Sequence, residues 1–447
     1  MKQILHLVLA TSVVVFISCA GKAQQSQTLG EDFDKKLGEL AEKYNMKGLA
    51  ASIIFQDGSV WNGAIGQHGT SGDLSTNMLF EMGSNTKTFT AAMILQLADE
   101  GELTLSDTLG RFFDKIEHVD MGVTIKQLLG HTSGIYSYTN HADFGASVNS
   151  DIEKVWEPEE ILENFMEPMR FDPGSKWQYS NTNFLLLGLI IEHLDERDYE
   201  VSLRQRLLDP LELEHSYLDI FESYGEPRSG TWLTNGAYFN QPYPAFMSAA
   251  WAAGGLVCTT EDLAHWAEKL YTNQVISEAW TDSMKKPVVV NGKETDFGLA
   301  LFYRNYGGYE ILGHGGATLQ HSLMDYVPEL GVTLVTVTNE QGRSAALDRV
   351  QEELFDMLFE KPWGLSIEHK REDDLTIFPN PVRSMIQIGS DQGFNDVHIY
   401  DMAGELLISV TGQNQIDVSG LVPGTYLLEA LSSQSGELLR ERFMVVD

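Results

Sequence analysis

The sequence predicts an α+β domain, an antiparallel sheet flanked by helices, followed by a small all-β sandwich. Strand-like segments at both ends of residues 29–363 enclose a long helical middle, a pattern typical of a sheet closed by its own termini. Short alternating strands fill residues 375–447, after a charged linker at residues 364–374. The 447 residues exceed what one core ordinarily holds, and a 43% hydrophobic, 21% charged composition is that of a globular protein.

The first 23 residues are expected to be a signal peptide. Lys2 is followed by an apolar run too short to span a membrane, and small residues flank position 22 where a signal peptidase would read them. A lipid anchor on Cys19 is the alternative. Cleavage after Ala23 leaves Cys258 as the remaining cysteine, so we expect no intrachain disulfide and a small buried residue at that position.

Strand signals fall into two groups within the first domain. Residues 49–67 read as a hairpin that turns at Asp57-Gly58. Three further strands and a closing helix are expected near the end of the domain, at residues 308–316, 320–331, 332–340 and 344–360. Between the two groups, residues 91–97 are apolar almost all round, which predicts a central buried helix.

Ser84 and Lys87 stand at the start of that helix. Their i, i+3 spacing places both side chains on one face, where free backbone N–H groups collect. A lysine close to a serine hydroxyl in a partly desolvated place can accept its proton. The alternative is a helix-capping serine followed by a solvated lysine.

Two more motifs favour the catalytic interpretation. Ser84-Asn85-Thr86-Lys87, Tyr179-Ser180-Asn181 and His314-Gly315-Gly316 occur in that order at wide spacing. Over about residues 48–360 the chain resembles the penicillin-recognising serine hydrolases: class C β-lactamases, D,D-peptidases and related esterases. The resemblance implies a β-lactamase/transpeptidase-like fold.

The resemblance also implies roles for individual residues. Ser84 would be the nucleophile, with Lys87 and Tyr179 as its activating pair, Tyr179 acting as a tyrosinate stabilised by the lysine charge. Asn181 would bind the substrate amide or steady Lys87. Gly315 and Gly316 would let the substrate backbone approach the strand edge, and the N–H groups of Ala317 and Ser84 would form the oxyanion hole.

His314 departs from the penicillin-destroying members, which carry lysine at that position. We expect it to donate one hydrogen bond to the substrate and to be largely neutral at pH 7 to 8, gaining a proton below about pH 6.5. Uncharged esters or amides would then be better substrates than carboxylate-bearing ones.

Weaker signals surround these motifs. His131 is expected to be structural, Tyr136 and Tyr138 could line the pocket or lie on the surface, and Gly254-Gly255 suggests a tight turn near the site. Loops at residues 140–157 and 217–247 would shape the pocket.

Charge and motif content limit the partners. The net charge of −34 argues against nucleic acid, and no later apolar run is long enough to span a membrane. No metal-ligand spacing and no phosphate-binding loop is visible, so no metal or cofactor is expected.

Residues 375–447 resemble the C-terminal sorting domain of type IX secretion. Phe378-Pro379-Asn380-Pro381, a hairpin around residues 401–406 and the segment at residues 421–428 carry the resemblance. A carbohydrate-binding sandwich is the alternative, but the exposed aromatic row that it needs is missing. The resemblance implies the type IX machinery as a partner and a secreted or cell-surface location.

The sequence as a whole predicts an exported serine hydrolase that acts through a Ser84 acyl-enzyme on a small-molecule or peptide substrate. Esters, amides, D-amino-acid peptides and β-lactams stay open. The rival is a slow or inactive receptor for peptidoglycan fragments. Oligomeric state, lipidation of Cys19 and removal of the sorting domain are not determined.

Overall fold

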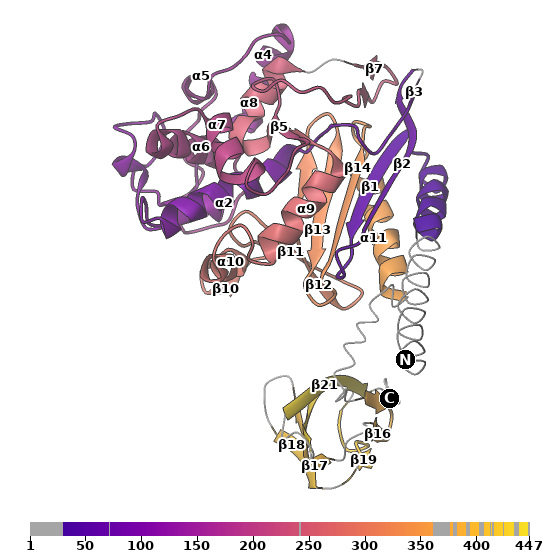
Figure 1. Cartoon of the computed structure of the whole chain (residues 1–447). Helices are drawn as coiled ribbons and strands as arrows, with labels where there is room; N and C mark the ends of the chain where they lie inside the picture. Colours follow the sequence, from indigo (N-terminus) through magenta and orange to yellow (C-terminus); the bar gives the residue numbers. More distant parts are fainter. Residues whose placement is uncertain are drawn as a thin grey trace, which may run out of the picture. The chain divides into compact units, whose positions relative to one another are not determined.

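A computed structural model describes residues 30–70, 72–240 and 243–360, and in the C-terminal part residues 376–378, 382–389, 394–401, 406–411, 413, 415–422, 424–432 and 438–445. The chain forms two compact units, Met1–Trp363 and Gly364–Asp447 (Figure 1). The expected signal peptide at residues 1–23 and the expected linker at residues 364–374 lie outside the described residues.

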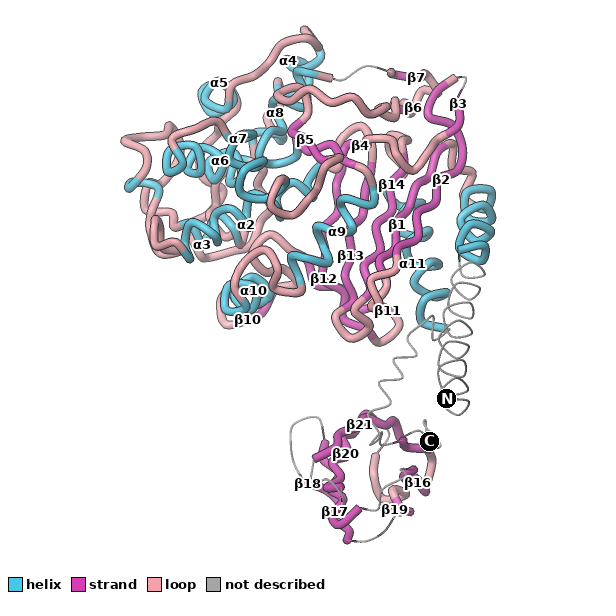
Figure 2. The backbone as a smooth tube through the Cα atoms, in the orientation of Figure 1, coloured by secondary structure: helices cyan, strands magenta, loops and turns pink. Residues whose placement is uncertain are grey.

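A seven-stranded antiparallel sheet is the centre of the first unit (Figure 2). Its order is β11-β12-β13-β14-β1-β2-β3, so β1 near the start of the domain pairs with β14 near its end. The sheet closed by its own termini and the expected hairpin of β1 and β2 are both confirmed. The strands are β1 (Gly48–Ile54), β2 (Val60–Gly69), β3 (Gly72–Asp73), β11 (Phe302–Tyr306), β12 (Tyr309–Ala317), β13 (His321–Val327) and β14 (Val332–Thr338).

Helices cover both faces of this sheet because its central strands are apolar on both sides. In β1, Leu49, Ala51 and Ile53 pack against the helix at residues 30–43 and against α11 (Ser344–Glu360). Ala50 and Ile54 belong to the core of the opposite face, where α9 (Thr260–Tyr271) packs on β1, β13 and β14. The period-two alternation of β1 therefore divides one strand between two cores.

A helical region extends from the α9 face, seen on one side of the sheet in Figure 1. Its central helix, α2 (Thr86–Asp99), is buried almost all round, which confirms the expected central helix. The other helices are α3 (Ile125–Leu129), α4 (Phe144–Ser150), α5 (Pro158–Asn164), α6 (Thr182–Asp195), α7 (Tyr199–Leu203), α8 (Pro244–Gly254) and α10 (Glu278–Lys285). A small sheet β4-β8-β5 lies beside them, made of β4 (Phe80–Glu81), β8 (Leu256–Cys258) and β5 (Ser216–Leu218). The short hairpins are β6 (Thr231–Trp232) with β7 (Tyr238–Phe239) and β9 (Val289–Val290) with β10 (Lys293–Glu294).

Two small antiparallel sheets make up the described part of the second unit. One has the order β15-β16-β19 and the other β18-β17-β20-β21. Tyr426, Leu428 and Ala430 are buried on one face of β20, as their alternation predicts. The small all-β fold is thereby confirmed. The strands are β15 (Thr376–Phe378), β16 (Met385–Gly389), β17 (Phe394–Asp401), β18 (Leu406–Thr411), β19 (Gln415–Asp417), β20 (Gly424–Ser432) and β21 (Leu438–Val445).

Two expectations about burial and membranes can be checked among the described residues. Cys258 is a free, fully buried cysteine on β8, and burial raises the pKa of its thiol well above the usual range. It is therefore a packing residue. None of the described helices is both long and apolar enough to cross a membrane.

Candidate active site

Ser84 lies in a tight helical turn, η1 (Gly83–Asn85), that leads directly into α2. Gly83 adopts a positive φ of 50°, a conformation that glycine reaches at little cost. Asn85 stabilises the turn: its buried Nδ2 donates to the Met82 carbonyl oxygen at 3.1 Å and to Ser322 Oγ of β13 at 2.8 Å. The turn is thus tied to the large sheet, and Ser84 is held on a rigid support.

Lys87 is fully buried one turn along the same helix, with its Nζ 3.0 Å from Ser84 Oγ. The same Nζ donates to the Ala253 carbonyl oxygen at 2.5 Å. Among the described residues Lys87 has no carboxylate partner, and burial lowers its pKa well below the usual value. The solvated lysine of the alternative interpretation is excluded.

The Ala253 carbonyl is a part of the site that the sequence analysis missed. It lies at the end of α8, just after Trp251, whose φ of 36° and ψ of −123° interrupt the helix. Neighbouring Ala252 directs its carbonyl oxygen at Thr90 Oγ1 of α2, at 2.7 Å. This local break turns two consecutive carbonyls toward α2. The adjacent Gly254-Gly255 pair was the only signal in the sequence, and Gly254 does border the site.

Tyr179 stands in the loop before α6, and His131 supports that loop. The His131 ring is fully buried and lies 4.2 Å from the Tyr179 ring, centroid to centroid. Its Nδ1 accepts a hydrogen bond from the Ser180 backbone N–H at 3.2 Å. Lys87 Nζ lies 5.0 Å from the centre of the Tyr179 ring. Three segments distant in sequence therefore meet here, with His131 in the supporting place expected of it.

Burial shifts both Lys87 and Tyr179 toward their uncharged forms. It raises the pKa of Tyr179 far above that of an ordinary phenol, although Ser84 offsets part of the rise by hydrogen bonding. The buried Tyr179 hydroxyl makes no hydrogen bond of standard geometry within the described ranges. The predicted tyrosinate is therefore not supported, because desolvation disfavours the phenolate and also the lysine cation that would stabilise it.

The end of β12 comes against the nucleophile turn. A Cβ placed on Gly83 would lie 2.7 Å from the backbone nitrogen of Ala317. A Cβ on Gly316 would collide with the Met82 carbonyl oxygen, so the motif's glycines allow a strand and a turn to touch. Gly313 is the last β12 residue paired with the edge strand β11, where its partner is Phe302. Gly315, Gly316 and Ala317 extend past that strand and border a cavity.

His314 is neutral and presents an acceptor, which corrects two expectations. His314 is 98% buried, and burial lowers its pKa to about 3. Its Nδ1 lies 2.7 Å from the Gly315 carbonyl oxygen, so Nδ1 carries the proton and donates to that oxygen. Nε2 is left with a lone pair and no partner in the described chain. His314 therefore carries an acceptor rather than a free donor, and no protonation near pH 6.5 is expected.

Two cavities meet at Ser84 and Ala317. One has a volume of about 330 Å³ and reaches from Tyr179 and His314 to the start of α11. The other is a narrow cavity of about 70 Å³ that Asn181 and Tyr138 border. Phe144 and Phe246 close the narrow cavity, and they come from the two loops expected to shape the pocket.

Asn181 borders the narrow cavity but does not contact Lys87. Its Nδ2 donates to Thr139 Oγ1 at 3.1 Å, and its backbone N–H donates to Ser137 Oγ at 3.0 Å. The expected steadying of Lys87 thus comes from the Ala253 carbonyl instead. Tyr138 lines the cavity, whereas Tyr136 is buried under the guanidinium of Arg170, 4.3 Å from its ring centre.

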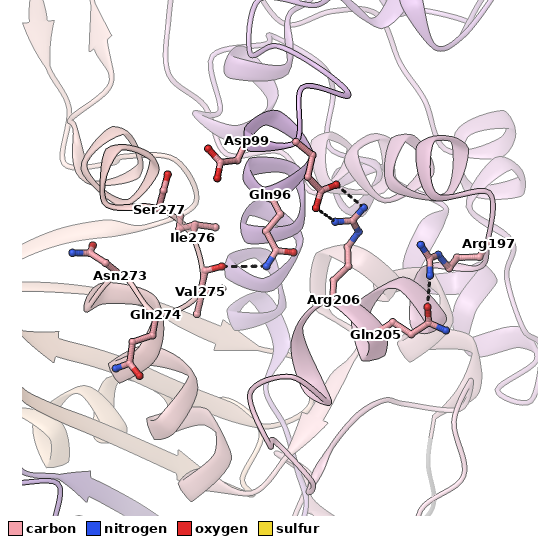
Figure 3. A pocket seen from close by; sticks show the side chains of 11 residues that line it. Gln96, Asp99, Arg197, Gln205, Arg206, Asn273, Gln274, Val275, Ile276 and Ser277 are labelled. Carbon is pink, nitrogen blue, oxygen red and sulfur yellow. Dashed lines mark hydrogen bonds and ion pairs between the residues drawn. The ribbon is translucent and has the colours of Figure 1, made fainter.

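A larger polar cavity of about 670 Å³ lies at the other end of α2 (Figure 3). Arg206 bridges Glu100 and Asp195 there, and Gln96 Nε2 donates to the Val275 carbonyl oxygen at 3.1 Å. Arg197 also pairs with Asp195, and Asp99 accepts a hydrogen bond from Trp280 Nε1 at 3.0 Å. None of the predicted site residues borders this cavity. Across the described ranges no cluster of three histidine, cysteine or carboxylate side chains is arranged to hold a metal ion.

Comparison with known proteins agrees with this geometry. The sequence pattern of the Beta-lactamase family matches residues 33–356, and that of the secretion system C-terminal sorting domain matches residues 376–445. Penicillin-binding protein 4* of Bacillus subtilis (strain 168) is 27% identical over 389 residues, a match that covers 80% of this chain and 82% of that protein.

Solved structures show the same fold. A D-stereospecific amidohydrolase from Streptomyces sp. superposes with a TM-score of 0.62 at 27% identity, covering 70% of this chain and 97% of that one. The D-amino acid amidase from Ochrobactrum anthropi SV3 gives a TM-score of 0.65 at 21% identity, covering 75% and 100%. The β-lactamase/transpeptidase-like fold is confirmed.

The export signal at the C-terminus is of the type IX kind, which links the protein to secretion or to the cell surface. The family match over residues 33–356 places the chain among the serine hydrolases at family level. The chain belongs to the Beta-lactamase family and ends in a secretion system C-terminal sorting domain.

Proposed function

We propose that the protein is an exported serine hydrolase that cleaves esters or amides through an acyl-enzyme on Ser84. The observation that carries the proposal is the 3.0 Å contact between Ser84 Oγ and the buried Nζ of Lys87. Burial lowers the pKa of Lys87 and so makes its amine a better proton acceptor than an exposed lysine, and its neighbour is the hydroxyl that must lose a proton.

The Ala253 carbonyl orients the acceptor. Nζ donates an N–H to this oxygen and lies 3.0 Å from Ser84 Oγ. In the neutral amine of the proposed mechanism, the lone pair would accept the Ser84 proton across this contact. Ser84 Oγ then attacks the substrate carbonyl carbon while its proton passes to Lys87 Nζ. The backbone N–H groups of Ser84 and Ala317 would hold the resulting oxyanion, each typically contributing ~3 kcal/mol in the transition state.

Breakdown of the tetrahedral intermediate needs a proton for the leaving amine or alcohol. We assign this proton to the Tyr179 hydroxyl, which lies close to Ser84 and would recover the proton held on Lys87. Water then attacks the acyl-enzyme carbonyl with the same groups in reverse, releasing the acid and restoring the Ser84 hydroxyl. No step requires a cofactor.

The relatives support amide or ester cleavage as the reaction class. Penicillin-binding protein 4* and a D-stereospecific amidohydrolase, both 27% identical to this chain, are named for penicillin binding and for D-stereospecific amide hydrolysis. D-amino-acid amides are therefore a reasonable narrower class to test, beside uncharged esters and β-lactams.

Covalent labelling tests the nucleophile directly. A fluorophosphonate should add one mass increment to the wild type and none to Ser84→Ala, read by intact-mass spectrometry. An adduct of equal yield on the Ser84→Ala protein would refute the assignment.

Turnover then separates the hydrolase from the receptor. A short-chain nitrophenyl ester, a D-amino-acid amide, a D-Ala-D-Ala peptide and nitrocefin form the panel. Turnover of any one that is lost in Ser84→Ala supports the hydrolase. Stoichiometric labelling with no turnover of the panel would favour the receptor for peptidoglycan fragments.

A further inference from the structure

We propose that the 330 Å³ cavity beside Ser84 selects substrates that place a positively charged hydrogen-bond donor, such as a primary ammonium group, against His314 and Asp348. The inference names the substrate class of the proposed hydrolase site and rests on that proposed function. It concerns one cavity, bordered also by Phe302, His321 and Leu323.

The cavity offers no cation to a substrate carboxylate. Neither lysine nor arginine borders it. Arg304, on β11, borders the next cavity and is paired there with the buried carboxylate of Asp325. Lys87 lies behind the Tyr179 ring with its pKa lowered by burial, so it provides little lasting charge. A carboxylate placed in this cavity would lose its hydration without gaining an ion pair.

His314 borders the cavity and carries an acceptor without a partner among the described residues. Its proton is committed to the Gly315 carbonyl oxygen, so the buried Nε2 presents a lone pair that no described group satisfies. A carboxylate oxygen brought against this lone pair would be repelled, whereas an N–H donor would satisfy it. A lysine at the same position would attract a carboxylate and repel an ammonium group.

Asp348 supplies the negative charge. It lies on α11 and borders both this cavity and the next one, and it has no ion pair in the described chain. The cavity is also bordered by His321 and by the hydroxyl side chains of Ser84, Tyr179, Ser322 and Ser344. His321 Nε2 accepts from the Gly342 N–H at 3.0 Å, which leaves Nδ1–H as a donor. That donor is neutral, since burial lowers the pKa of His321. The cavity therefore holds two neutral imidazoles and one carboxylate.

The second cavity, which continues from this one, is bordered by more acidic than basic side chains. Asp348 connects the first cavity to this second one of about 530 Å³, which Asp296, Asp325, Glu352 and Arg304 also border. Arg304 is paired with Asp325 and Arg349 with Glu352, so Asp296 and Asp348 are the carboxylates left without an ion pair among the described residues that border it. A substrate long enough to extend there would meet an excess of carboxylates. Both segments therefore favour a cationic substituent.

Competitive inhibition by three small probes of similar shape measures this preference. The probes are benzylammonium, benzyl alcohol and phenylacetate, and the reporter is hydrolysis of a neutral nitrophenyl ester at pH 7.5 and 150 mM salt. We expect the inhibition constant of benzylammonium to be at least tenfold lower than that of phenylacetate, with benzyl alcohol between them.

Variants identify the groups that set the ratio. Asp348→Asn should reduce the ratio of the phenylacetate and benzylammonium constants about fivefold, the scale of one partly solvated charge pair. Asp114→Asn removes the same charge from an exposed loop position away from the cavity and should leave the ratio unchanged. His314→Lys should invert the preference toward phenylacetate.

The two proposals fail in different ways. If none of the panel substrates is turned over, the proposed hydrolase fails, and binding of the same probes measured by ligand-observed NMR still decides the charge preference. A phenylacetate constant equal to or below that of benzylammonium in the wild type would overturn the inference. So would an equal change of the ratio in Asp348→Asn and Asp114→Asn, because the net acidity of the protein would then explain it.

Discussion

Replacing Gly83 by alanine should abolish most of the activity while the protein stays folded. Gly83 precedes the nucleophile and has a φ of +50°. A Cβ there would lie 2.7 Å from Ala317 N, a backbone atom that cannot rotate away. The strand end and the nucleophile turn must therefore move apart by several tenths of an ångström, which separates the two N–H groups proposed for the oxyanion hole.

Gly83→Ala is expected to lower both the folding stability and the rate of catalysis. Alanine in the left-handed region costs about 1 kcal/mol of folding free energy. Displacing one oxyanion donor costs about 3 kcal/mol in the transition state, or about 10²-fold in kcat. KM should change less, because the donor acts mainly on the charged intermediate.

Gly58→Ala is a matched control. Gly58 has a φ of +78° in the turn between β1 and β2, and a Cβ there meets nothing within 4 Å. It should show the same loss of about 1 kcal/mol in urea unfolding and unchanged kcat. Ester hydrolysis, fluorophosphonate labelling and unfolding would be measured on both variants. If Gly83→Ala keeps the kcat of Gly58→Ala, the oxyanion role of the contact between the turn and Ala317 is wrong.

Three further predictions concern proton transfer and the domain boundary. Lys87→Ala and Tyr179→Phe should each lower kcat/KM by more than ~10²-fold. Because the two residues act as a unit, kcat/KM of the double variant should be only slightly lower than that of the worse single variant. Losses that multiply in the double variant would contradict a shared proton-transfer task. Lys87 must be neutral to accept a proton, and burial lowers its pKa. We therefore expect kcat/KM to rise with pH and to reach a plateau well below pH 10.5. A plateau reached only above pH 10 would indicate a phenolate base instead. A chain ending at Trp363 should hydrolyse esters with unchanged kcat/KM in vitro, yet fail to be exported in a host with type IX secretion; loss of stability on truncation would place the boundary elsewhere.

The sequence by itself was sufficient for features that depend on local spacing. The i, i+3 step from Ser84 to Lys87 brings their side chains together on any helix, and the structure places them 3.0 Å apart. The hairpin signal found β1 and β2, strand signals near the end of the domain found β12, β13 and β14, and alternation found the inner face of β20. The order of these segments was enough to infer a sheet closed by its own termini.

Tertiary structure decided what depends on burial and on contacts between distant segments. Burial favours the neutral forms of Lys87 and Tyr179 and lowers the pKa of His314 to about 3, and no local pattern reports how much water a folded site excludes. The Gly315 carbonyl decides which nitrogen of His314 carries the proton. The break at Trp251 brings the Ala253 carbonyl to Lys87 across 166 positions of sequence. Side-chain chemistry is a property of residue type, but protonation and hydrogen-bond direction are set by the neighbours that only the folded chain supplies.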